Sequence, residues 1–138
     1  MTAKEYLEQY KEADRLARRL AAEYEREREL IDAVRSTADL EGLPHGNGIK
    51  NPVEDRVIRL VDKAAEFKMA EIDALHLKQE VFETIQKVKG IEAEVLTLRY
   101  INLMPWERIA DEINYSVPGT YNIHSRGLSA VEEIINGQ

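Results

Sequence analysis

Residues 100–128 read YINLMPWERIADEINYSVPGTYNIHSRGL, and their pattern predicts two short helices joined by a tight turn. The first helix carries an apolar set at helical spacing: Trp106, Ile109, Ala110 and Ile113. Asn114 suits a left-handed turn position, because asparagine is among the few non-glycine residues that adopt it readily. Ser116 is a good N-cap for the second helix, and Pro118 lies within its first turn. Two helices arranged in this way have the outline of a DNA-reading module.

The charge of this segment argues against strong DNA binding by the module alone. The whole chain has a net charge of −7. Residues 91–138 hold three arginines (Arg99, Arg108 and Arg126) against seven carboxylates, a net charge of −4. Because phosphate neutralisation supplies nearly all non-specific affinity for DNA, we expect the module to bind DNA weakly unless something else assists it.

Composition places the chain among helix-rich globular proteins. Its 138 residues suffice for one domain or two small units, with 43% hydrophobic and 33% charged residues. No apolar run approaches the roughly 18 residues that span a bilayer, and the N-terminus lacks a signal-peptide core. The chain has no cysteine, so nothing points to secretion. We therefore expect a cytoplasmic protein without a membrane partner.

The first 90 residues predict a long antiparallel helical hairpin with a coiled-coil character. Residues 2–40 contain no glycine or proline, and Glu27 is the one interruption of an apolar seam in steps of four and three. The seam consists of Tyr6, Tyr10, Ala13, Ala17, Leu20, Tyr24, Ile31 and Val34. Residues 41–52, EGLPHGNGIKNP, suit a chain-reversing loop.

A second helix is predicted from Val53 to Lys89, closed by Gly90 as the C′ residue. Its expected apolar face is Val57, Ile58, Leu60, Val61, Ala64, Phe67, Ile72, Leu75, Phe82, Ile85 and Val88. Two such helices bury each other's stripes. The seam offers more apolar surface than one partner helix covers, so we also expect a homodimer formed through the hairpin.

Three linked motifs carry a family resemblance. EVLTLRY at 94–100, W-E-x-I-A at 106–110 and I-x-x-R-x-L at 123–128 resemble region 4 of the sigma-70 family. A long helical hairpin before such a module, with AKEYLEQ at 3–9, is similar to small sigma-factor-like phage proteins of Gram-positive hosts. The resemblance implies an all-α protein: a hairpin over 1–90, then a helix-turn-helix over 91–138. It also implies a transcriptional regulator in the bacterial cytoplasm that binds promoter DNA, RNA polymerase or both.

The resemblance places the DNA-binding residues on the second helix of the module and its cap: Ser116, Val117, Tyr121, Asn122, Ser125 and Arg126. In sigma-like proteins the outward positions are rich in charged and glutamine side chains, whereas here only Arg126 is charged. Thr120 stands where a buried valine is usual, and Pro105 where a capping threonine is common. We expect Asn122 to read a base and Arg126 to position the backbone.

The alternative hypothesis is a non-enzymatic protein-interaction module that keeps the scaffold without binding DNA, for example an inhibitor of a host or phage DNA-binding protein. No nucleophile elbow, P-loop or zinc-protease motif is present, so the sequence does not predict an enzyme, a cofactor or a small-molecule substrate. His45, His76 and His124 have no ligand spacing, which argues against a metal site and favours solvent-exposed or capping roles.

Overall fold

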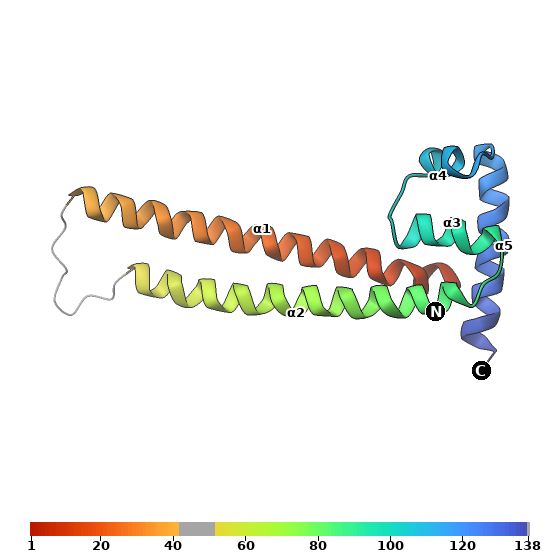
Figure 1. Ribbon diagram of the computed structural model, residues 1–138. Coiled ribbons are helices and arrows are strands. Elements are labelled where there is room, and N and C mark those ends of the chain that lie inside the picture. The colour runs from red at the N-terminus through yellow and green to blue at the C-terminus, as the bar shows by residue number, and fades with distance from the viewer. Residues whose placement is uncertain (42–51, 138) are drawn as a thin grey trace. The chain divides into compact units, whose positions relative to one another are not determined.

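The computed structural model describes residues 1–41 and 52–137, and in these ranges the chain forms five helices and no strand. The helices are α1 (Ala3–Glu41), α2 (Pro52–Gln86), α3 (Ile91–Tyr100), α4 (Trp106–Ile113) and α5 (Val117–Asn136) (Figure 1). The predicted all-α class is thus confirmed. Most of the loop predicted at 41–52, with His45, lies outside the described residues. None of the helices described is long and apolar enough to cross a bilayer.

The chain divides into two compact units. Unit 1 comprises Met1–Asp14 and Asp73–Gln138, and unit 2 comprises Arg15–Ile72. Each long helix contributes to both units, because α1 and α2 both continue past the boundaries. The division after Gly90 stays a prediction.

Unit 2 is held by contacts between its segments of α1 and α2. The rings of Tyr24 and Phe67 stack with their centroids 6.2 Å apart. Glu23 pairs with Lys63 Nζ at 3.7 Å, and Glu27 pairs with Arg56 Nη1 at 3.6 Å. Later residues of α1 therefore meet earlier residues of α2. Glu27, which interrupts the apolar seam, forms this ion pair with Arg56. The Glu27 side chain is only 14% exposed.

The predicted apolar face of α2 is half wrong. Five of its residues are exposed: Ile58, Val61, Ile72, Leu75 and Phe82. The buried positions of the middle and end of α2 include three that the pattern reading passed over: Ala70, Ala74 and Val81. Small alanines let another helix approach closely, so they serve as core residues although they contribute little to an apolar pattern. Helix α2 consequently carries two apolar stripes, one buried and one in solvent.

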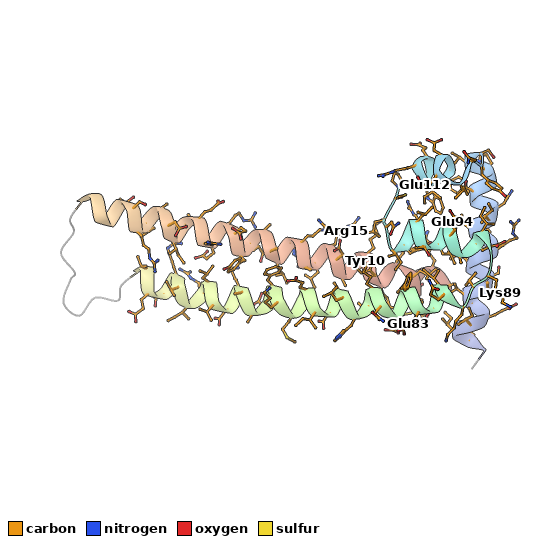
Figure 2. All side chains as sticks on the ribbon, in the orientation of Figure 1. Tyr10, Arg15, Glu83, Lys89, Glu94 and Glu112 are labelled. Atoms are coloured by element: carbon orange, nitrogen blue, oxygen red, sulfur yellow. The ribbon has the colours of Figure 1, made fainter. Side chains whose placement is uncertain are left out.

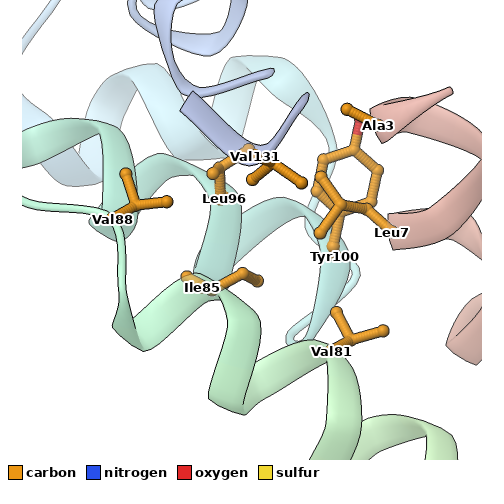
Figure 3. Packing of buried hydrophobic residues seen from close by; sticks show 8 residues of the cluster. All are labelled: Ala3, Leu7, Val81, Ile85, Val88, Leu96, Tyr100 and Val131. Carbon is orange, nitrogen blue, oxygen red and sulfur yellow. The ribbon is translucent and has the colours of Figure 1, made fainter. Parts of the chain in front are cut away.

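Unit 1 has a core to which four helices contribute. Its buried residues are Ala3, Leu7, Val81, Ile85, Val88, Leu96, Tyr100 and Val131 (Figure 3). Leu7, Ile85 and Leu96 are fully buried, and each such side chain stabilises the fold by roughly 1.5–3 kcal/mol relative to an exposed one. Tyr6 Oη and Thr84 Oγ1 lie 2.8 Å apart, so the two hydroxyls at the edge of this core are hydrogen-bonded to each other.

The connection between α2 and α3 differs from the sequence prediction. Helix α2 ends at Gln86, not at Lys89, and Gly90 is the residue immediately before α3 instead of the C′ residue of α2. Gly90 has φ 82°, a conformation that favours glycine, and a Cβ there would lie 3.1 Å from Glu92 Oε2. Gly90 thus separates the two helices as predicted, but it is the N-cap of α3.

Candidate nucleic-acid interface

The turn between α4 and α5 is built as the sequence predicts. Asn114 is left-handed, with φ 59° and ψ 43°, and Tyr115 N donates to Ala110 O at 3.0 Å to close the end of α4. Ser116 has an extended backbone, and its Oγ accepts a hydrogen bond from Gly119 N at 3.0 Å. Ser116 is thus the N-cap of α5. Pro105 occupies the N-cap position of α4 without a side-chain cap.

Helix α5 contacts both α3 and α4, and its inward face is closely packed. Val95 of α3, Ile109 of α4 and Ile123 of α5 form a second buried cluster. Gly127 lies directly against Leu96, because a Cβ on Gly127 would be 3.1 Å from Leu96 Cδ1 and Cγ. Thr120 is fully buried, and its hydroxyl donates to Ser116 O at 2.9 Å. This buried hydroxyl is therefore hydrogen-bonded within its own helix.

The six predicted site residues lie on the cap and first three turns of α5. Asn122, Ser125 and Arg126 are exposed, as is the cap Ser116, while Val117 is half-buried. Tyr121 is 46% exposed, and its ring packs edge-on against Trp106 with centroids 5.1 Å apart. Tyr121 and Arg126 lie about 140° apart around the helix, at the two edges of the outward face. Asn122 and Ser125 occupy its middle.

The cation on this face has a counter-charge within the same unit. Arg126 Nε donates to Glu92 Oε1 at 3.0 Å, joining α5 to the first turn of α3. The backbone N–H of Glu92, and then the Arg126 guanidinium, hold the pKa of this carboxyl below its ordinary value. Any phosphate that approaches Arg126 therefore competes with a carboxylate already in place.

Arg99 is also engaged in the scaffold. Its guanidinium lies over the Trp106 ring, 4.5 Å from the centroid, and Nη1 donates to Met104 O at 3.0 Å. The third arginine, Arg108, is exposed on α4. Its neighbours on the exposed side of that helix are acidic: Glu107, Asp111 and Glu112. Glu94 on α3 adds another exposed carboxylate (Figure 2). Most of the exposed charges on α4 are therefore acidic.

Tyr100, Trp106 and His124 form an aromatic cluster between α3, α4 and α5 that the sequence does not predict. Tyr100 Oη lies 2.7 Å from His124 Nε2, and the His124 ring contacts Trp106 edge-on with centroids 4.6 Å apart. The expectation of an exposed or capping role is wrong for His124, which is half-buried. Its position four residues after Thr120 and three before Gly127 was the signal available, since that spacing defines the inward face.

Burial sets the protonation states in this cluster. It lowers the pKa of His124 to about 4, with the nearby cations of Arg99 and Lys4 acting in the same direction. It raises the pKa of Tyr100 to about 12, reinforced by the Glu8 carboxylate and opposed by Arg99. Both side chains are therefore neutral near pH 7, and His124 adds no positive charge to the module.

Among the residues described, no three histidine, aspartate or glutamate side chains come together as a metal site. Comparison of the chain with protein-family profiles, curated proteins and solved structures finds no match.

Proposed function

We propose that this chain is a phage-type transcriptional regulator in which α4 and α5 form a helix-turn-helix similar to region 4 of the sigma-70 family. It contacts promoter DNA, RNA polymerase or both. The observation that carries the proposal is the turn itself: a left-handed Asn114 followed by the Ser116 cap of a helix whose outward side takes no part in the core. That arrangement is typical of a helix that inserts into the major groove.

We further propose the following architecture around the module. Residues 1–90 form an antiparallel helical hairpin and residues 91–138 the helix-turn-helix. Two copies associate through the hairpin, and the protein acts in the bacterial cytoplasm. A dimer presenting two modules offsets the weak affinity of each one, because two linked contacts bind far more tightly than one.

On DNA, Asn122 is the base-reading residue, since asparagine bonds in a bidentate way to adenine. Ser116, Val117, Tyr121 and Ser125 line the same groove face, with apolar contact to thymine methyls from Val117 and Tyr121. Arg126 positions the module on the phosphate backbone once it leaves Glu92. With so few cations, the salt dependence of binding corresponds to about one to three phosphates per module.

A second candidate function is a protein-interaction module, such as an inhibitor of a DNA-binding protein. One specific observation favours it: Arg99 and Arg126 are both engaged within unit 1, and the exposed side of α4 is acidic. An acidic surface on a helix-turn-helix scaffold complements a basic DNA-binding surface on another protein.

The experiment is a fluorescence-anisotropy titration on phage promoter fragments over a range of salt concentrations, with and without bacterial RNA polymerase. We expect weak binding alone and tighter binding with polymerase. Asn122→Ala should lose about 1–3 kcal/mol of discrimination at one base pair, and Arg126→Ala should weaken all sequences alike. Ser129→Ala, exposed further along α5, is the matched control. Binding in neither arm at low salt supports the protein-interaction function instead.

A further inference from the structure

The solvent-facing side of α2 in unit 1 carries two large apolar residues that the core does not use. Leu75 is 59% and Phe82 39% exposed, whereas Ala74 and Val81, one position earlier in each case, are buried. Leu75 and Phe82 also line an open hollow of about 280 Å³ together with Lys78, Gln79 and Ile101. This part of the surface is therefore apolar and concave, in a protein whose net charge is −7.

The exposed residues follow the spacing of a coiled-coil seam. Leu75, Gln79, Phe82 and Gln86 are separated by steps of four, three and four, which places the two apolar residues at d and the two glutamines at a. A narrow stripe of this kind matches a single partner helix better than a broad globular surface.

The charges beside the seam fit a parallel partner helix in register. Lys78 occupies g and Glu83 occupies e, the positions that form ion pairs between parallel helices in register. An antiparallel pair centred on Gln79 brings the Lys78 side chains of both copies together, which is unfavourable. Because Lys78 and Glu83 complement each other only between two copies of α2, the charge pattern is self-complementary.

We infer that a second copy of this chain packs its α2 against this seam, parallel and in register. Leu75 and Phe82 then meet their own counterparts and fill the hollow, while the Gln79 amides pair across the twofold axis. Two Lys78–Glu83 ion pairs close the sides. This inference rests on the self-association proposed above and adds to it the face and the register; it is independent of DNA binding.

Cysteine cross-linking tests the face, because the chain contains no cysteine of its own. Gln79→Cys should form a covalent dimer under mild oxidation, since each position a lies beside its counterpart in a parallel pair. Asp73→Cys, exposed away from the seam, is the matched control and should stay monomeric on a denaturing gel. Light scattering on the unmodified protein runs in parallel. A monomer by scattering overturns self-association as a whole, whereas a dimer in which Gln79→Cys does not cross-link overturns only this face.

Charge reversal tests the register. Lys78→Glu and Glu83→Lys should each raise the dimer dissociation constant roughly tenfold, through two lost ion pairs and two new repulsions. Lys78 also lies over the Tyr10 ring at 5.6 Å, and Glu83 accepts from Gln79 Nε2 at 3.0 Å, so each single variant loses an internal contact as well. The double variant is decisive, because it restores the pairs between copies but not those contacts. Recovery of most of the lost affinity supports the parallel register, and failure to recover overturns it.

Discussion

Tyr100 and His124 join α3 to α5 through a hydrogen bond of 2.7 Å between the phenol oxygen and Nε2. The rings also stack, with centroids 5.7 Å apart and planes 24° from parallel. Since the two residues lie on different helices of one unit, this contact fixes how the inward side of α5 meets α3. Neutral His124 is part of the packing, and a proton on its ring is disfavoured first by burial and then by the nearby charge of Arg99.

Acidification should therefore weaken the fold. The pKa of His124 is about 4 in the folded chain and near its ordinary 6.5 in the unfolded chain, so the unfolded state takes up a proton first. The contribution of His124 to the free energy of unfolding has its full value above about pH 6.5. It decreases as the pH falls towards about 4. Thermal melting followed by circular dichroism across this range should show a smaller pH dependence for His124→Gln. Equal pH dependence of the parent and the His124→Gln variant would contradict the lowered pKa of His124.

Gly127→Ala tests the close contact of α5 with α3. Alanine favours a helix by about 1 kcal/mol over glycine, but its Cβ would lie 3.1 Å from two carbons of the fully buried Leu96. Overpacking a rigid site costs about 1–3 kcal/mol, so we expect a net loss of about 1 kcal/mol in urea unfolding. Ser129→Ala, exposed on the same helix, should be nearly neutral. A more stable Gly127→Ala protein would show that Leu96 moves aside easily.

Replacing Glu27 and Arg56 of unit 2 together with apolar residues should preserve stability, whereas replacing Arg56 alone should not. Glu27 Oε1 is buried without a hydrogen bond, 3.6 Å from Arg56 Nη1. Arg56→Met leaves the carboxylate unpaired and should cost about 1–3 kcal/mol, whereas the double variant Glu27→Leu, Arg56→Met should be as stable as the parent or more so. Urea unfolding of the parent, of Glu27→Leu, of Arg56→Met and of the double variant checks this. A double variant weaker than both single variants contradicts it.

Glu92→Gln should strengthen DNA binding if Arg126 is the positioning residue. The change removes the carboxylate that engages Arg126 and leaves the guanidinium available to phosphate. Glu94→Gln alters the net charge equally but at an exposed position with no ion pair to Arg126, so it is the matched control. In the anisotropy titration, Glu92→Gln should increase the salt dependence by up to about one phosphate contact. Equal effects of the two variants would assign the gain to net charge alone.

Local chemistry accounts for the parts of the fold that were predictable from sequence. Asn114 and Ser116 adopt the turn and cap geometry expected of them, because these preferences depend on neighbouring backbone groups only. Helix formation over residues 3–41 likewise follows from a stretch free of glycine and proline.

The errors concern partners distant in the chain. Arg126 and Glu92 are 34 residues apart, and nothing local to either position indicates that they pair. The buried side of α2 depends on which helices cover it, so Ala74 and Val81 are core residues while the larger Leu75 and Phe82 are in solvent. The partial burial of His124 was unpredictable for the same reason, since its ring contacts Tyr100 and Trp106 on other helices.

The packing of Leu96 against Gly127 determines which positions of α5 can be substituted freely. The contact that sets the spacing of α3 and α5 uses a position without a side chain, and the other anchors of α5, Ile123 and Val131, also face inward. The middle of the outward face, Asn122 and Ser125, contributes nothing to this spacing. New side chains can therefore be installed there without loosening the fold, so the outward face can change independently of the core. A library randomised at those two positions should remain almost entirely folded.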